Sequence, residues 1–195
     1  MPCADGCGAT GLPAFEIVIV ADQAGIAAVA DHALGDQVKS VPFDTRNISA
    51  ARNAGIAMAA GNVIAFIDDD AVPEPSWLTH LTAPFADPAV AASGGYVIGR
   101  NGISFQWKGR TVDRNAQTET LPMTGAEVFT GTPDRAIKTE GTNIAIRRDV
   151  LVALGGFDPA FAFYVDETDL NMRLAHAGHR TVIVPMAQVH HGFPP

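Results

Sequence analysis

The sequence predicts an α/β domain with a mostly parallel central sheet, and two features carry that prediction. Residues 15–21 and 62–68 are short apolar runs rich in β-branched side chains, the pattern of strands buried on both faces. Segments of helical character follow each of them, and strands that alternate with helices are typical of parallel sheets. Ligands of such sheets bind beyond the carboxyl ends of the strands, so polar residues there are the first candidates for a site.

Two helices have clear boundaries in the sequence. Asn47 or Ser49 can cap a helix that Gly61 ends, because short polar side chains accept hydrogen bonds from free backbone N–H groups and glycine tolerates a left-handed turn. From Asp166 the apolar positions recur at helical spacing, and Gly178 ends that helix.

The remaining elements follow from local patterns along the chain. Further strands are expected at residues 37–43, 89–99, 104–110 and 180–185, and further helices at 25–34 and 74–85. Residues 140–161 have the pattern of a strand, a short helix and a turn. Residues 111–138 are polar and weakly periodic, which predicts a loop or hairpin region of the kind that often carries function.

Composition places the chain among globular proteins and excludes some partners. Its 195 residues are 47% hydrophobic, which is enough for the core of one domain, expected at residues 15–195. An irregular leader is expected at residues 1–14. Its two cysteines, Cys3 and Cys7, are interpreted as incidental. The formal charge is −8 without a basic stripe, so nucleic acid is not an expected partner. No apolar run reaches the ~20 residues of a membrane span, and the leader lacks the segments of a signal peptide. We therefore expect a cytoplasmic protein, with peripheral attachment to the inner face of the membrane as an alternative.

Three consecutive aspartates, Asp68, Asp69 and Asp70, end the strand at 62–68. Adjacent carboxylates repel one another, so they commonly need a compensating cation. Because side chains alternate along a strand, Asp68 and Asp70 point the same way and Asp69 points oppositely. Two carboxylates on one side suit a divalent cation such as Mg²⁺ or Mn²⁺. A solvated acidic turn, with Asp70 capping the next helix, is the alternative.

The residues around the aspartates resemble family 2 glycosyltransferases, which have the GT-A fold. The matching residues, in order, are Arg52, Asn53, Gly55, Gly61, Asp68, Asp69, Asp70, Pro73, Trp77 and Leu78. The resemblance implies a GT-A-like α/β/α sandwich in which Asp68 and Asp70 hold a metal ion and the diphosphate of a nucleotide sugar. It implies that Asp69 touches the sugar or the ribose and that Arg52 and Asn53 lie near the nucleotide. For Arg52, a surface charge on a helix is the alternative.

A second stretch, residues 141–174, resembles the same family. Its matching residues are Gly141, Asn143, Arg147, Gly155, Gly156, Phe157, Asp158, Asp166, Glu167, Asp169, Leu170, Arg173 and Leu174. In inverting members the second acid of the pair is the catalytic base, although this chain has Asp-Glu where many relatives have Glu-Asp. Asp166 can cap the helix with Asp169 answering it, and Asp169 can also pair with Arg173. Glu167 has no such structural task and lies where the helix dipole favours its charged form, so we expect it to be the base, with Asp166 as the alternative.

The resemblance assigns further residues at the two ends of the chain. His190 is expected to complete the metal shell or contact the diphosphate, with His191 as the alternative, and Asp22 is the candidate that reads the nucleobase or ribose. Nothing before Phe15 resembles the first strand–helix unit of the family, so the domain is expected to be incomplete at its N-terminus. An exposed edge strand favours pairing with a second copy, so we expect either a homodimer or a domain of reduced stability.

These features together predict a metal-dependent, inverting glycosyltransferase that moves a sugar from a nucleotide-diphosphate sugar to a glycan or lipid-linked acceptor. Trp107 and Asn143, together with residues 111–138, are expected to shape the acceptor side. A non-catalytic remnant that binds nucleotide sugars or glycans is the first alternative. A receiver-like or phosphatase-like Mg²⁺ domain is the second, but it leaves the segments around Arg52 and Glu167 unexplained.

Overall fold

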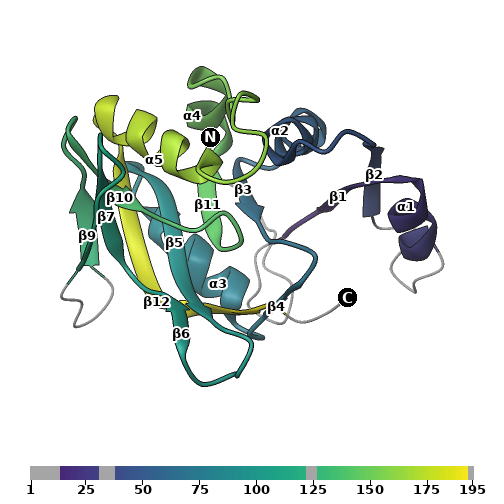
Figure 1. The fold of residues 1–195 in the computed structure, drawn as a ribbon, viewed down its shortest axis with the longest axis horizontal. Helices are drawn as coiled ribbons and strands as arrows, with labels where there is room; N and C mark the ends of the chain where they lie inside the picture. Colours follow the sequence, from purple (N-terminus) through teal and green to yellow (C-terminus); the bar gives the residue numbers. More distant parts are fainter. Residues whose placement is uncertain (1–13, 31–37, 122–126, 193–195) are drawn as a thin grey trace.

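Helices cover both faces of a seven-stranded sheet in this protein, as an α/β/α sandwich requires (Figure 1). The structure, a computed structural model, describes residues 14–30, 38–121 and 127–192. Cys3, Cys7 and the predicted leader up to residue 13 lie outside the described residues, as do the last residues of the helix predicted at 25–34.

The N-terminal part forms a small unit of its own at one end of the molecule (Figure 1). Its strands pair in parallel, and the pair is separate from the seven-stranded sheet. The apolar pattern predicts burial of the first strand on both faces, but its residues are only half-buried because β2 is its one partner among the described strands. The elements are β1 (Ile17–Ala21), α1 (Gln23–Ala30), β2 (Val38–Pro42) and α2 (Ile48–Met58).

The predicted cap of α2 is confirmed. The Asn47 Oδ1 atom accepts a hydrogen bond from the backbone N–H of Ala50 at 2.9 Å. The helix ends earlier than predicted, because Ala59, in an extended conformation, is its C-cap in place of Gly61.

The seven-stranded sheet is mixed. β5 and β12 run parallel, and β11 lies antiparallel between β3 and β5, so that β3, β5 and β12 share one direction. This shared direction agrees with the predicted class, although most neighbouring pairs are antiparallel. The order is β3-β11-β5-β12-β4, with β6 on β5 and β9 on β12. The strands are β3 (Val63–Phe66), β4 (Ala71–Pro73), β5 (Val90–Ile98), β6 (Phe105–Trp107), β9 (Glu127–Thr130), β11 (Ile144–Arg147) and β12 (Arg180–His191).

The long strand β12 places the C-terminal histidines. Its pattern predicts a strand at 180–185, but after a register shift between Val184 and Gln188 the strand continues to His191. Near its end it pairs with the short strand β4, where His191 lies opposite Ala71. Ala71, which follows the three aspartates, and His191, the last residue of β12, are therefore neighbours.

Alternation along the strands divides the core into two clusters. In β11, Ala145 faces the cluster beneath α3, while Ile144 and Ile146 face the cluster beneath α2, α4 and α5. The helices are α3 (Trp77–Thr82), α4 (Arg148–Ala153) and α5 (Asp166–His176), and a 3₁₀ turn at Ala83–Ala86 follows α3. Across the described ranges, none of the helices has the length and apolar character to cross a bilayer.

The region predicted as a loop or hairpin holds a second small sheet. β10, β7 and β8 form an antiparallel sheet in that order. Ala136 of β10 and Ala175 of α5 belong to one buried cluster, so this sheet packs against α5. The strands are β7 (Arg110–Asp113), β8 (Thr118–Thr120) and β10 (Arg135–Lys138).

Replacing Gly95 with alanine is expected to destabilise the fold by about 2 kcal/mol or more, because it overpacks a buried site. An added Cβ would lie 1.7 Å from the Ala187 carbonyl oxygen and 2.5 Å from the Asn143 amide nitrogen. Those two atoms form a hydrogen bond of 2.8 Å, which the new methyl group would break.

Gly99→Ala in the loop just after β5 is the matched control, because its added Cβ would meet ordinary contacts of 3.5 Å or more. Urea unfolding of both variants measures the difference. Equal stability of Gly95→Ala and the wild type would contradict this account of the close approach.

Candidate functional site

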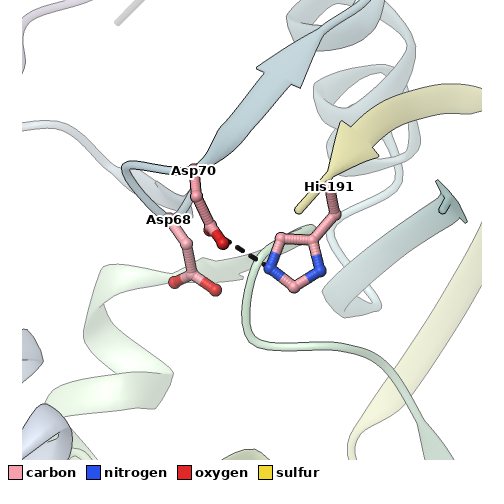
Figure 2. A group of neighbouring side chains, drawn as sticks. All are labelled: Asp68, Asp70 and His191. Carbon is pink, nitrogen blue, oxygen red and sulfur yellow. Dashed lines mark ion pairs between the residues drawn. The ribbon is translucent and has the colours of Figure 1, made fainter. Parts of the chain in front are cut away.

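Asp68 and Asp70 follow β3, and the structure brings His191 of β12 to them (Figure 2). The donor atoms of the three side chains all lie within 4.8 Å of one another, and the residues are half-buried. His191 Nε2 is 3.2 Å from Asp70 Oδ1. The pairing of β4 with the end of β12 creates this proximity, because it places the turn after β3 beside the last residues of the sheet.

This group of side chains has the chemistry of a divalent metal site. Two carboxylates and an imidazole offer three ligands from one side, and the remaining positions would be left to water or to phosphate oxygens. Asp69 is exposed and Asp68 and Asp70 are half-buried, which matches the expected alternation, although β3 ends at Phe66 and the three aspartates lie beyond the strand. The role of Asp69 toward the sugar or ribose stays a prediction.

The structure separates the two candidate histidines. The sequence favours His190 as the metal ligand, but its Nε2 lies 2.7 Å from Glu74 Oε1, and the alternative, His191, is the residue beside the aspartates. Adjacent residues of a strand point to opposite faces, so only one of the two can face the metal group. Sequence alone does not reveal which, because the register shift in β12 decides it.

Arg52 of α2 joins the aspartates to the acidic pair. Its guanidinium group forms ion pairs with Asp166 and, at 3.1 Å, with Asp68. The side chain is 10% exposed and its guanidinium carbon lies 5.2 Å from the centre of the Phe157 ring. The alternative of a surface charge is therefore wrong, and contact of Arg52 with a nucleotide stays a prediction.

The acidic pair opens α5, but the capping differs from the prediction. The N-cap is Val165, in a left-handed conformation with φ of 68°, and Asp166 is the first residue of the helix. Asp166 turns to Arg52 instead of capping. The predicted pair of Asp169 with Arg173 is confirmed, at 2.7 Å.

The two acids titrate differently. Burial raises the pKa of Asp166, the Arg52 charge offsets part of that, and the carboxylate of Glu167 raises it again. Burial also acts to raise the pKa of Glu167, but the charge and hydrogen bond of Lys138, with a hydrogen bond from Asp166, outweigh it and leave the pKa below its usual range. Asp166 therefore takes up a proton more readily, and Glu167 is the member of the pair that stays ionised.

Sequence reasoning includes Lys138 only as the last residue of the range expected on the acceptor side, and it does not single out Glu140. The Nζ atom of Lys138 lies 2.7 Å from Glu140 Oε1 and 3.0 Å from Glu167 Oε1. Burial raises the pKa of Glu140 despite the nearby ammonium group. Lysine is rarely so buried, yet its partner Glu167 lies 29 residues away and no local pattern links the two.

Two residues assigned to the nucleotide have structural hydrogen bonds. The amide of Asn53 donates to the Phe157 carbonyl at 2.7 Å and accepts from the Phe157 N–H at 2.8 Å, which ties α2 to the turn before α5. Asp22 Oδ1 accepts from the Gly25 N–H at 2.8 Å, at the start of α1. The amide of Asn53 is thus already engaged, and nucleotide contact by Asp22 stays a prediction.

The two residues assigned to the acceptor side, Asn143 and Trp107, have different environments in the structure. Asn143 is fully buried; its amide accepts from the indole N–H of Trp77 at 2.8 Å and donates to the carbonyls of Tyr96 and Ala187. It therefore belongs to the core, which corrects its assignment to the acceptor side.

Trp107 is half-buried, and its ring lies beneath Lys138 and Arg110. Its indole N–H finds no acceptor among the described residues. Trp107 thus lies near the acidic pair through Lys138, and its contact with an acceptor stays a prediction.

Curated relatives of the chain include glycosyltransferases. It is 31% identical over 128 residues to glucosyl-dolichyl phosphate glucuronosyltransferase of Haloferax volcanii, which covers 64% of this chain and 39% of the relative. It is 27% identical over 190 residues to pre-mycofactocin glycosyltransferase of Mycobacterium tuberculosis, which covers 93% of this chain and 38% of the relative. The chain thus spans about two fifths of the length of these relatives.

Solved structures with a similar fold include two glycosyltransferase complexes. One is GalNAc-T7 with UDP, GalNAc and Mn²⁺, with a TM-score of 0.67 and 18% identity over 90% of this chain and 37% of that one. The other is the mannosyltransferase PcManGT of Pyrobaculum calidifontis with GDP-Man and Mn²⁺, with a TM-score of 0.62 and 20% identity over 92% of this chain and 48% of that one. These neighbours confirm the GT-A fold.

A family comparison agrees with the fold. The model of glycosyl transferase family 2 matches residues 5–155, which is well over half of the chain and includes the three aspartates and Arg52. The chain therefore belongs to glycosyl transferase family 2.

Proposed function

We propose that this chain is the catalytic domain of a metal-dependent, inverting glycosyltransferase that uses a nucleotide-diphosphate sugar as donor. One observation carries the proposal. Arg52 contacts both Asp68 of the metal group and Asp166 of the acidic pair. The group that would bind the leaving diphosphate and the group that would accept the proton are therefore neighbours. The Mn²⁺ and nucleotides named for two structural neighbours support the same donor chemistry.

The reaction needs one base and one centre of positive charge. A hydroxyl of the acceptor attacks the anomeric carbon, the bond from that carbon to the diphosphate breaks, and the nucleoside diphosphate leaves with the electron pair. Glu167 accepts the proton of the hydroxyl, since it is the ionised member of the pair. A metal ion bound by Asp68, Asp70 and His191 would stabilise the charge of the leaving diphosphate. A single displacement of this kind inverts the anomeric centre without a covalent nucleophile.

The metal is best matched by Mn²⁺. Carboxylates suit both Mg²⁺ and Mn²⁺, but an imidazole ligand in place of a third carboxylate favours a transition ion. Mg²⁺ is the weaker candidate for the same side chains.

The acceptor is a glycan or a lipid-linked sugar. The name of the Haloferax relative refers to a dolichyl phosphate sugar, and that of the mycobacterial relative to a different molecule. A lipid-linked acceptor would bring the chain to the inner face of the membrane as a peripheral protein. The predicted homodimer finds no support in these comparisons and is not part of the proposal.

The histidine pair gives a matched test of the metal group. His191→Ala is expected to weaken Mn²⁺-assisted binding of a nucleoside diphosphate by about tenfold or more, because it removes one of three ligands. His190→Ala, its neighbour on the same strand, should bind like the wild type, because His190 contacts Glu74. Calorimetry with UDP, GDP, CDP and dTDP, each with and without Mn²⁺, measures the affinities and identifies the preferred nucleobase of the donor.

Asp70→Asn should reproduce the effect of His191→Ala. Equal affinities in both histidine variants would contradict the placement of the metal. Binding of a nucleotide sugar without any turnover would identify the non-catalytic remnant instead.

The role of Glu167 is tested by Glu167→Gln. The release of nucleoside diphosphate from the matching nucleotide sugar is expected to fall by about 10²–10⁴-fold, the usual loss when a general base is removed. Nucleotide affinity should stay unchanged, because Glu167 is not part of the metal group.

Asp169→Asn on the same helix is the control, because Asp169 pairs with Arg173 outside the acidic pair. A large loss in Asp166→Asn together with normal activity of Glu167→Gln would move the base to Asp166.

A further inference from the structure

Lys138 ends β10 with its ammonium group held between two carboxylates. Its side chain is only 11% exposed, and its Nζ atom contacts Glu140 at 2.7 Å and Glu167 at 3.0 Å. The same atom lies 4.3 Å from the centre of the Trp107 ring. Burying a lysine costs free energy unless its charge is paired, so this placement calls for an explanation.

Glu140 by itself would balance the charge of Lys138. It lies two residues along the chain, and its contact is the shorter of the two. The second contact reaches across to the start of α5, where Glu167 is 14% exposed beside Asp166. A lysine that served only the small sheet would not need that second partner.

We propose that Lys138 is a positioning residue for Glu167: anchored by Glu140 and the Trp107 ring, it orients the Glu167 carboxylate and balances its charge. The inference rests on the proposed function for the part that calls Glu167 the base. The contact itself, and its effect on the titration of Glu167, do not depend on that function.

The charges around Glu167 favour this role. Burial opposes its ionised form, and Lys138 makes the largest favourable contribution to that form. Asp166 on α5 is the neighbouring acid, and it is itself held by Arg52 of α2. A carboxylate whose pKa is held low stays ionised as the pH falls, until the pH passes through that pKa, so Lys138 extends the pH range in which Glu167 can accept a proton.

Glu140, the other partner of Lys138, has charged neighbours of its own. Lys138 and Arg110 of β7 both favour the ionised form of Glu140, whereas Glu167 opposes it. Arg110 also lies 4.7 Å from the centre of the Trp107 ring. Glu140 thus contacts Lys138 directly, and Arg110 shares the Trp107 ring with it.

The test uses the double variant Lys138→Met/Glu140→Gln in the whole chain. It removes one positive and one negative charge, so the net charge is kept and no unpaired partner remains at position 140. The pKa of Glu167 is expected to rise by about one unit or more when the neighbouring cation is lost. Carbon-13 NMR of labelled glutamate side chains measures it, with the signal assigned by its absence in Glu167→Gln.

Activity provides the second readout. The acid limb of the kcat profile for nucleoside diphosphate release should move to higher pH by the same amount, with little change in KM for the nucleotide sugar. Lys138→Arg keeps a cation and should leave the limb near its original position. Glu140→Gln alone leaves Lys138 to Glu167, so the pKa of Glu167 should not rise.

The outcomes separate the two claims. An unchanged pKa of Glu167 in the folded double variant, shown by near-UV circular dichroism, overturns the positioning role whatever the activity. A raised pKa with a shifted acid limb supports it. The third outcome is a raised pKa of Glu167 in the double variant together with a wild type that turns over no UDP-, GDP-, CDP- or dTDP-sugar. That outcome supports the role of the Lys138 contact and overturns the proposed function.

Discussion

The ion pairs of Arg52 are the interaction on which the site depends. Its guanidinium group connects α2 to the turn after β3 through Asp68 and to the first residue of α5 through Asp166. The backbone leaves room for it, since a Cβ on Gly141 would lie 2.6 Å from a guanidinium nitrogen. A planar group with donors on two sides suits this task, because it can hold two carboxylates in a fixed relation.

Opposite charges alternate across the site, because a charge that is partly removed from water needs a partner of opposite sign. Asp68, Arg52 and Asp166 form one series of contacts, and Glu167, Lys138 and Glu140 form a second. The two series meet at the adjacent acids of α5, where two carboxylates compete for protons. Such an arrangement separates the roles of neighbouring acids, since one cation cannot serve both equally.

Family motifs also contain residues whose contacts are structural. The amides of Asn53 and Asn143 bond to backbone and indole groups inside the protein, and both lie beside glycines where a Cβ would collide with them. Buried amides need all their partners, so these positions admit few other side chains. A sequence motif therefore does not distinguish residues that contact a ligand from residues that hold those residues in place.

Spacings of two to four residues suffice to predict the strand before the aspartates, the helix that carries Asp166 and Glu167, and the pair of Asp169 with Arg173. They do not predict the short strand β4 after the aspartates, which exists because it pairs with the distant β12. The tertiary structure decided which histidine joins the aspartates, what Arg52 contacts and where Lys138 lies. Arg52 and Asp166 are 114 residues apart, and Lys138 and Glu167 are 29 apart. Periodicity describes only the faces of one element, whereas contacts between elements depend on sheet register and on how helices pack across it.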